Sequence, residues 1–335
     1  MKSRVWTTID FETAGIQSDF ARVPYSSDTS AYGWLPVPML CFKGEAGPTA
    51  LLTAGTHGDE YEGQVALRRL ARDLSTTKLN GRVIILPALN HPAVRAGRRN
   101  SPLDGGNLNR LFPGTSEGGP TAMIAHFVAT ELFPLADLVI DLHSGGSSLD
   151  YLPLALAHPG RSESEKHAVH RLLTSFAAPY SLLTDGAGGG AGTTLYAAAE
   201  QRGIPAITTE LGRGATLWEA GLSIAEGGLR RVLRDYGLAP DIAVDEPAQS
   251  RFLQYQGPSA SIYAPCDGLF EPLAKPGDCV EEGHIAGLIH PLDHALATPV
   301  ELRFATRGIV AFRRFLTLTS TGDALFGLAA EPAKQ

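Results

Sequence analysis

Short apolar runs alternate with amphipathic segments between about Pro36 and Leu233, and this alternation constrains the fold more than any other feature of the sequence. Four runs are nearly continuous in apolar character, as expected for central strands covered on both faces: Ala50–Ala54, Val83–Ala88, Leu138–Leu142 and Ala206–Glu210. Helical spacing of apolar residues predicts three helices: Glu62–Leu74, Thr121–Leu132 and Ser162–Phe176. The pattern predicts an α/β fold with a sheet covered by helices.

The pattern of the sequence changes after about Asp245. From there, short apolar segments are separated by glycine and proline, and helical periodicity is weak. We therefore expect a catalytic domain over residues 1–244 and a small all-β domain over residues 245–335. Two segments of this second domain, 264–270 and 276–283, resemble the half-barrel of biotinyl and lipoyl carrier domains. Those carriers modify a lysine at a hairpin, and only Lys334 lies between Gly283 and the end of the chain, so an unmodified structural module is expected.

Charge and hydropathy narrow the classes of partner. The formal net charge of −7 argues against nucleic acid, because phosphate binding needs a concentrated basic surface. No apolar run approaches the roughly 18 residues that span a bilayer, and no segment resembles a signal peptide, so we expect no membrane partner and a cytoplasmic location. The three cysteines lack CxxC spacing and predict no disulfide framework; we expect all three to be buried.

The strongest local motif is Thr53-Ala-Gly-Thr-His57-Gly-Asp-Glu60, which lies where a predicted strand ends and a predicted helix begins. Ligands of open α/β sheets collect at the carboxyl ends of strands. If the helix begins near Glu60, a separation of three residues can bring the imidazole and the carboxylate to one point, and zinc accepts both types of ligand. By itself the motif also suits a surface histidine beside a helix-capping acid.

A third ligand is available at a second strand end, where Asp141-Leu-His143-Ser-Gly-Gly turns into glycines. Two histidines and one glutamate make a His₂Glu zinc site with an open position for water. Asp141 either fixes the ring of a ligand or points away from the site. Glu210 closes another apolar strand and could take a proton from the attacking water; its alternatives are a helix N-cap or a surface acid.

The segment from Asn90 to Gly114 is rich in arginine, asparagine, glycine and proline. This composition is not expected in a hydrophobic core. Guanidinium groups bind carboxylates in bidentate fashion, so the segment suits a substrate pocket, with a solvated loop as the alternative.

Together these motifs resemble the succinylglutamate desuccinylase/aspartoacylase family, relatives of the zinc carboxypeptidases. The resemblance rests on four motifs in the family's order: Gly55-Thr-His57-Gly-Asp-Glu60, Asn107-Leu-Asn109-Arg110-Leu-Phe-Pro-Gly114, Asp141-Leu-His143-Ser and Glu210. It implies a mixed central sheet with flanking helices, zinc carboxypeptidase-like, in the first domain. It also implies a zinc-dependent amidohydrolase that removes the acyl group from a small-molecule N-acyl amino acid.

The family's residue roles carry over position by position. The resemblance implies one zinc ion per subunit on His57, Glu60 and His143, with Glu210 as the base. It further implies that Asn109 and Arg110 receive the substrate carboxylate, and that an upstream arginine polarises the scissile carbonyl. We choose Arg99 for that role, with Arg98 as the alternative.

An inserted segment, residues 101–106, and the β-rich C-terminal module look closest to the branch that contains N-acetyl-diaminobutyrate deacetylases; a succinylglutamate desuccinylase-like activity is the other option within the family. A side-chain amine on the substrate would then meet an acid such as Asp104 or Glu117. The alternatives outside this reading are a zinc carboxypeptidase acting on peptides and a non-catalytic metal-binding sensor. We expect a homo-oligomer.

Overall fold

The computed structural model describes residues 2–186, 192–247 and 249–332. Its α-helices are α1 (Glu62–Leu74), α2 (His91–Ala96), α3 (Pro120–Phe127), α4 (Glu163–Phe176), α5 (Leu195–Glu200) and α6 (Glu219–Asp235). The strands up to residue 210 are β1 (Gly15–Pro24), β2 (Trp34–Lys43), β3 (Glu45–Ala54), β4 (Asn80–Leu86), β5 (Leu138–Leu142), β6 (Leu149–Tyr151), β7 (Leu154–Ala157), β8 (Tyr180–Leu183) and β9 (Ala206–Glu210). The later strands are β10 (Arg251–Tyr255), β11 (Ser261–Tyr263), β12 (Gly268–Pro272), β13 (Cys279–Val280), β14 (Ile285–His290), β15 (Val300–Arg303), β16 (Gly308–Arg314), β17 (Leu318–Thr319) and β18 (Ala324–Ala330). Short 3₁₀ turns cover Leu108–Arg110, Phe133–Leu135 and Pro258–Ala260.

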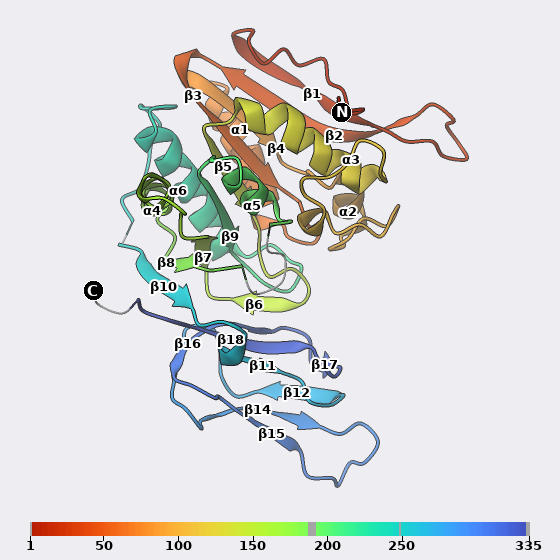
Figure 1. The fold of residues 1–335 in the computed structure, drawn as a ribbon, viewed down its shortest axis with the longest axis vertical. Helices are drawn as coiled ribbons and strands as arrows, with labels where there is room; N and C mark the ends of the chain where they lie inside the picture. The colour runs from red at the N-terminus through yellow and green to blue at the C-terminus, as the bar shows by residue number, and fades with distance from the viewer. Residues whose placement is uncertain (1, 187–191, 248, 333–335) are drawn as a thin grey trace.

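The predicted α/β architecture is confirmed, and Figure 1 shows the helices packed on the faces of a large mixed sheet. The sheet runs in the order β1-β2-β4-β3-β5-β9-β7-β8-β10-β18-β16-β13. At its centre β4, β3, β5 and β9 are parallel neighbours, whereas β1 with β2, β2 with β4, and β7 with β9 are antiparallel pairs, and β7 is parallel to β8. All four predicted strands therefore lie side by side at the centre of the sheet.

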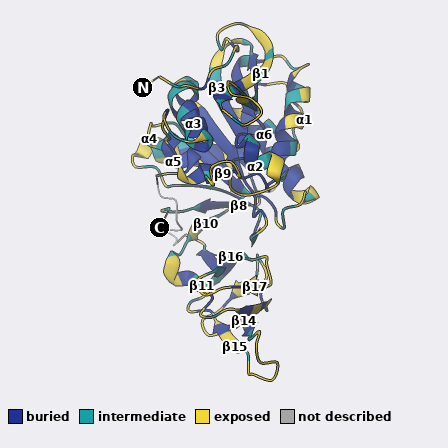
Figure 2. Cartoon of the chain, turned by 90° about the vertical axis from the view of Figure 1, so that its right-hand side faces the viewer, coloured by how far each residue is buried: buried dark blue, intermediate teal, exposed yellow. Residues whose placement is uncertain are grey.

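The apolar strands divide their side chains between two cores because successive residues of a strand point to opposite faces. Leu52 and Ile140 belong to the core under α1, α4 and α6, while their neighbours Leu51 and Val139 belong to the core under α3 and α5. Figure 2 shows this buried layer in dark blue between the outer helices. Burial on both faces explains why these strands are continuously apolar in the sequence.

The observed helices depart from the predicted ones over Thr121–Leu132, and α2, α5 and α6 were not predicted. The predicted helix over Thr121–Leu132 is α3 followed by a wider π-helical turn over Val128–Leu132, and Pro134, which has no N–H to donate, lies just beyond it. Helix α6 was not predicted, because Gly221, Gly227 and Gly228 lower its intrinsic helical propensity.

The C-terminal β region, defined here as residues 251–330, carries a four-stranded antiparallel sheet in the order β15-β14-β12-β17, which confirms the predicted small all-β part. The large sheet also continues into it: β10 lies parallel to β8 and antiparallel to β18. In addition β6 pairs with β16, with Phe312 opposite Tyr151. The hydrogen-bonded ladder therefore crosses the expected domain boundary near residue 245, and the likeness to a carrier half-barrel stays a prediction.

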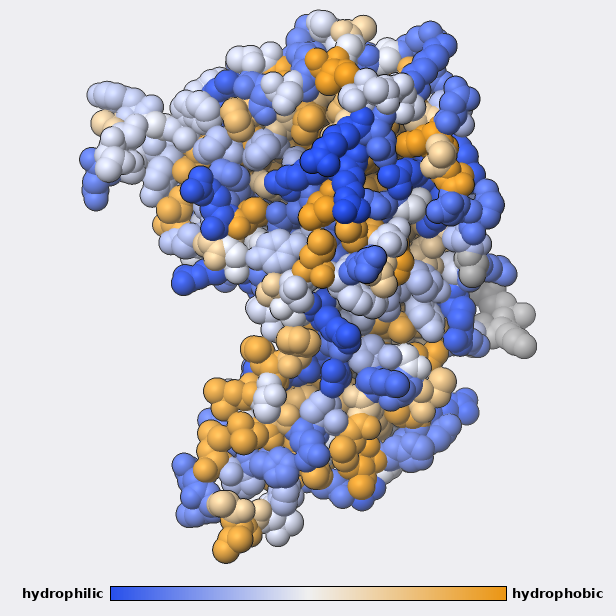
Figure 3. Space-filling view, turned by 180° about the vertical axis from the view of Figure 1, so that it is seen from behind, coloured by the Kyte–Doolittle hydropathy of each residue, from blue (hydrophilic) through white to orange (hydrophobic). Residues whose placement is uncertain are grey.

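Three further observations concern exposed apolar residues, the cysteines and membrane-spanning helices. Figure 3 shows hydrophobic residues gathered on the C-terminal β region, where Leu273, Leu292 and Leu318 are more than half exposed, but the expected homo-oligomer stays a prediction. Cys41 is buried, whereas Cys279 on the short edge strand β13 is exposed, so the expectation that all cysteines are buried was wrong. Among the described residues, no helix has both the length and the apolar character needed to cross a bilayer.

Candidate metal and substrate site

Two adjacent parallel strands deliver the histidines to one edge of the sheet. Strands β3 and β5 are paired with Ala54 opposite Leu142, so the residues that follow them leave the sheet side by side. His143 directly follows β5, and His57 lies three residues beyond the end of β3. Both side chains are almost fully buried, which excludes the alternative of a surface histidine.

The turn after β3 depends on two glycines. Gly55 has φ +70°, a left-handed conformation that other residues rarely adopt. At Gly58 a Cβ atom would lie 2.0 Å from the carbonyl oxygen of Ala93, so the backbone approach there allows no side chain. Helix α1 begins at Glu62 rather than near Glu60, and Glu60 therefore lies in this turn, with its carboxylate directed back at the imidazoles.

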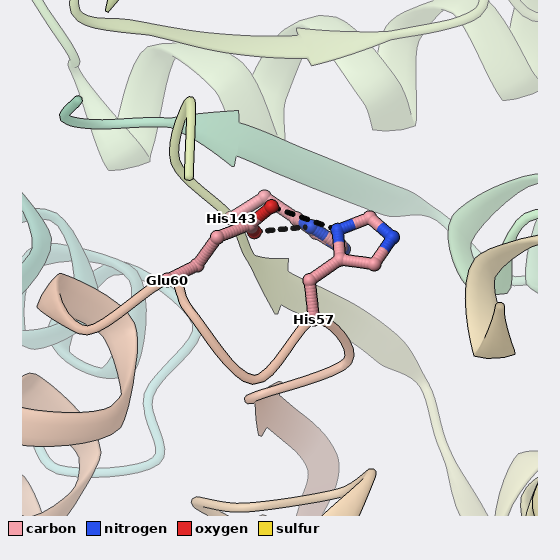
Figure 4. A group of neighbouring side chains, drawn as sticks. All are labelled: His57, Glu60 and His143. Carbon is pink, nitrogen blue, oxygen red and sulfur yellow. Dashed lines mark hydrogen bonds and ion pairs between the residues drawn. The ribbon is translucent and has the colours of Figure 1, made fainter. Parts of the chain in front are cut away.

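The three predicted ligands converge, as Figure 4 shows. Oε1 of Glu60 lies 2.8 Å from Nδ1 of His57, and Oε2 lies 2.7 Å from Nδ1 of His143. One ligand atom from each residue lies within 4.8 Å of the others, and all three side chains are buried. A buried group of two imidazoles and a carboxylate is suited to hold one metal ion.

The far nitrogens of both rings contact oxygen acceptors. Nε2 of His57 lies 3.1 Å from Oδ1 of Asn107, and Nε2 of His143 lies 2.8 Å from Oδ2 of Asp141. If each Nε2 carries the hydrogen, both Nδ1 atoms keep a lone pair directed at Glu60, which is the tautomer that a metal ion needs. The donor set therefore fits zinc in chemistry as well as in position.

Asp141 points into the site rather than away from it. Its other oxygen, Oδ1, accepts hydrogen bonds from the hydroxyls of Thr53 at 2.7 Å and Thr56 at 2.9 Å. The carboxylate has no exposed surface, so these contacts fix it in place. It can orient the ring of His143, which is the first of the two roles left open by the sequence.

Charges within this cluster oppose the effect of burial. Burial would raise the pKa of Glu60, but the two imidazoles outweigh it and hold this pKa below its ordinary value. Burial lowers the pKa of His57, which favours the neutral ring that binds metal. Burial would also lower the pKa of His143, yet Asp141 and Glu60 raise it well above the ordinary value, so a proton and a metal ion compete for this ring.

Glu210 ends β9, the strand next to β5, and its side chain faces the same cavity as the two histidines. Its Oε2 atom is buried and has no hydrogen-bond partner. Burial raises the pKa of Glu210 well above its ordinary value, and the negative charge of Glu60 adds to this effect. A carboxylate with one buried, unpaired oxygen in a cavity is positioned to exchange a proton, and Glu210 is neither a helix cap nor a surface acid.

The cavity has a volume of about 360 Å³ and is bounded by both parts of the chain. Tyr255, Tyr263 and Phe312 of the C-terminal β region line it together with residues of the central sheet. None of these aromatic residues was identified from the sequence, nor were Tyr151 and Tyr196. Tyr196 lies on α5 and the others reach the cavity on paired strands, and no local motif marks any of them.

The arginine and asparagine segment divides between cavity and solvent. Arg99, Asn109 and Arg110 line the cavity, whereas Arg98 is not among the described residues that line it. Nη1 of Arg99 lies 3.2 Å from Nδ1 of His57 and 3.7 Å from Oε1 of Glu60. This position favours Arg99 over Arg98 as the group beside a reacting carbonyl.

Backbone contacts hold the pair that was predicted to bind a carboxylate. Oδ1 of Asn109 accepts a hydrogen bond from the backbone N–H of Leu195 at 2.9 Å, and its Nδ2 lies 3.4 Å from Nε2 of His143. Arg110 donates to the carbonyl oxygen of Asn109 at 2.8 Å, and burial lowers its pKa from a very high ordinary value.

The two acids suggested for a substrate amine are elsewhere. Asp104 accepts hydrogen bonds from the backbone and hydroxyl of Thr121, and Glu117 forms an exposed ion pair with Arg4 at 3.4 Å. Neither acid is among the described residues that line the cavity, so the structure does not bring them to the site.

Comparisons with known proteins agree with this geometry. The family model described as the succinylglutamate desuccinylase/aspartoacylase catalytic domain matches residues 46–236. The N-alpha-acetyl-L-2,4-diaminobutyric acid deacetylase of Halomonas elongata is 38% identical over 330 residues, which are 98% of this chain and 95% of the relative.

Solved structures show a likeness over nearly the whole chain. The product-bound structure of the ectoine utilization protein EutE (DoeB) from Ruegeria pomeroyi is 38% identical with a TM-score of 0.91, covering 98% of this chain and 99% of that chain. The crystal structure of a succinylglutamate desuccinylase/aspartoacylase from Rhodobacter sphaeroides is 34% identical with a TM-score of 0.93, covering 99% of this chain and 100% of that chain.

Proposed function

Because the chain belongs to the succinylglutamate desuccinylase/aspartoacylase family, we propose that it hydrolyses the amide bond of an Nα-acyl amino acid and that its substrate is Nα-acetyl-L-2,4-diaminobutyrate. The chain is a hydrolase of this deacylase family with a buried His-Glu-His group suited to one metal ion. The observation that carries the proposal is the single cavity into which the histidines, Glu210 and Arg110 all project. The deacetylase of Halomonas elongata and the product-bound protein of Ruegeria pomeroyi support the choice of substrate.

His57, Glu60 and His143 would hold one zinc ion. When bound, zinc lowers the pKa of a water toward about 7 and polarises a carbonyl oxygen. Glu60 supplies negative charge from an almost fully buried position, and Asn107 and Asp141 hold the two imidazoles in the required tautomer.

Glu210 acts as the proton carrier of the reaction. Its carboxylate takes a proton from the water that attacks the acyl carbon and returns it to the departing amine. The pKa of Glu210 is raised mainly by burial, and this favours a carboxyl group that holds the proton between the two transfers.

The arginines fix the substrate around this point. Arg99, next to His57 and Glu60, donates to the oxygen on which negative charge develops as the carbonyl is attacked. Arg110 and Asn109 hold the carboxylate of the amino acid, for which a planar guanidinium offers two parallel hydrogen bonds. The orientation of the amide bond follows from these two anchor points.

The alternatives are less well supported. A carboxypeptidase must admit a polypeptide, whereas this cavity of about 360 Å³ is bounded on one side by Tyr255, Tyr263 and Phe312. A non-catalytic sensor has no need of a carboxylate with an unpaired buried oxygen, such as that of Glu210.

The decisive experiment is a panel of N-acyl amino acids incubated with zinc-loaded protein, with release of the free amine as the measurement. The panel combines acetyl and succinyl groups with diaminobutyrate, glutamate and aspartate, and it includes short peptides. We expect the highest kcat/KM on Nα-acetyl-L-2,4-diaminobutyrate. Hydrolysis of peptides without hydrolysis of any acyl amino acid would refute the proposal.

A further inference from the structure

Tyr196 on α5 lines the site cavity, and the reaction proposed above assigns no role to it. Its side chain is almost fully buried, at 7% exposure for the residue. The hydroxyl lies 3.2 Å from Nε2 of His158, and the two rings have centroids 4.8 Å apart. His158 directly follows β7, so two separate elements meet at this tyrosine.

Glu200 completes the chain of contacts at the end of α5. Its Oε2 lies 2.6 Å from Nδ1 of His158, and its Oε1 accepts the backbone N–H of the same histidine at 3.3 Å. An ionised carboxylate only accepts hydrogen bonds, so Nδ1 of His158 carries a hydrogen, and in the neutral ring Nε2 then keeps its lone pair. The hydroxyl of Tyr196 must then donate to Nε2.

The direction of this hydrogen bond decides whether the tyrosine hydroxyl can donate to a ligand or accept from it. A tyrosine hydroxyl has one hydrogen and two lone pairs. The hydrogen is committed to His158, and Thr194 hydrogen-bonds to the tyrosine as well. One acceptor position remains, and a lone pair in that position selects a hydrogen-bond donor on the substrate.

The charges around the cavity indicate which kind of donor group on the substrate this lone pair binds. Among the described residues that line it, Glu210 is the only carboxylate, and the proposed reaction uses it for the proton transfer. Arg110 and Arg99 supply positive charge for the carboxylate and the acyl oxygen. Glu200 lies behind Tyr196 with His158 between them, so its negative charge favours a cation at the tyrosine oxygen.

We propose that the hydroxyl oxygen of Tyr196 accepts a hydrogen bond from the side-chain ammonium of a diamino acid substrate, and that His158 and Glu200 are positioning residues that keep the hydroxyl in this role. The proposal rests on the proposed function and names the group that distinguishes a diaminobutyrate derivative from other acyl amino acids. A diamino acid carries its carboxylate and its ammonium a few bonds apart. Arg110 and Tyr196 on the wall of one small cavity can bind both.

The test compares a cationic substrate with a neutral one of the same shape, Nα-acetyl-L-2,4-diaminobutyrate and N-acetyl-L-norvaline, in which a methyl group replaces the ammonium. Tyr196→Phe removes the oxygen and keeps the ring, and His158→Leu removes the acceptor that orients it. We expect each variant to lower the ratio of kcat/KM, cationic over neutral, by about tenfold or more, as for hydrogen bonds to charged groups. His158→Gln, whose amide oxygen can accept the tyrosine hydroxyl, should restore part of the ratio.

A double variant separates positioning from a general structural effect. If His158 acts only through the hydroxyl, Tyr196→Phe combined with His158→Leu loses no more of the ratio than Tyr196→Phe alone. His290→Leu is the matched control, because His290 forms a similar pair with Glu271 at 2.7 Å on the exposed sheet of the C-terminal β region. We expect this control to keep the wild-type ratio.

Binding of the free amino acids gives a readout independent of turnover. Calorimetric titration of zinc-loaded protein with L-2,4-diaminobutyrate and with L-norvaline should show the same selective loss for Tyr196→Phe. Equal losses for the cationic and neutral compounds would overturn the role of Tyr196, and an unchanged ratio in His158→Leu would overturn the positioning role. Failure of the wild-type protein to deacetylate either compound would instead refute the proposed function.

Discussion

Replacing Asp141 by asparagine tests whether the ring of His143 is held for metal binding. Asp141 is fully buried and makes three contacts: 2.7 Å to Thr53, 2.9 Å to Thr56 and 2.8 Å to Nε2 of His143. Asparagine has the same shape but only one acceptor oxygen and no charge. If that oxygen stays with the threonines, an amide N–H faces the N–H of His143, and the ring is driven toward the tautomer with its hydrogen on Nδ1.

If the amide instead turns its oxygen to His143, the ring keeps an acceptor but loses the charged one. Charge-assisted hydrogen bonds are roughly twice as strong as neutral ones. Partners that orient metal-binding histidines typically contribute about 10- to 100-fold to metal affinity. We therefore expect Asp141→Asn to weaken zinc binding by 10- to 100-fold, or about 1.4–2.8 kcal/mol.

The assay is competition for zinc against a chelator of known affinity, with circular dichroism to verify folding. Asp137→Asn is the matched control, because Asp137 lies just before the same strand, is exposed, and accepts the backbone N–H of Thr49 at 2.7 Å far from the ligands. Equal zinc affinity in the two variants would refute the reasoning, since it would mean that Asp141 does not orient the ring.

Two further predictions concern turnover. Glu210→Gln should retain its zinc content and lose roughly 10²- to 10⁴-fold in kcat, because the amide cannot carry a proton; unchanged kcat would remove Glu210 from the mechanism. Arg110→Ala should lower kcat/KM by about 10- to 100-fold on a substrate with a free carboxylate and much less on its carboxamide analogue, since a charged hydrogen bond contributes about 1.5–3 kcal/mol. Arg95→Ala, an exposed arginine on α2, is the control, and an equal loss on the carboxamide would contradict the assignment of Arg110.

The parts that could be predicted from sequence depend on local patterns. Helix α1 spans the predicted residues because its apolar positions recur at helical spacing, and the strand ends at Ala54, Leu142 and Glu210 were recognisable because buried central strands are apolar throughout. Parallel neighbours bring such ends to one edge, so the convergence of the three metal-binding side chains could be inferred.

The parts that could not be predicted depend on contacts between distant segments. Tyr151 and Phe312 are opposite each other only because β6 pairs with β16, a separation that no local pattern reveals. Tyr196 and His158 come together only after α5 packs on β5 and β9, since His158 follows β7, the next strand in the sheet. In α6, Gly228 looks like a helix breaker, yet a Cβ there would lie 2.6 Å from the ring of Phe176, so the glycine permits close packing against α4.

The pairing of β10 with both β8 and β18, together with that of β6 with β16, limits how the molecule can open. A hinge motion of the C-terminal β region would have to break backbone hydrogen bonds within the ladder and expose Leu253 and Ala311, which are packed with Leu154 in a shared apolar cluster. Rigid swinging of the two parts is therefore disfavoured. Any ligand of the cavity must therefore enter and leave past strands that keep their places.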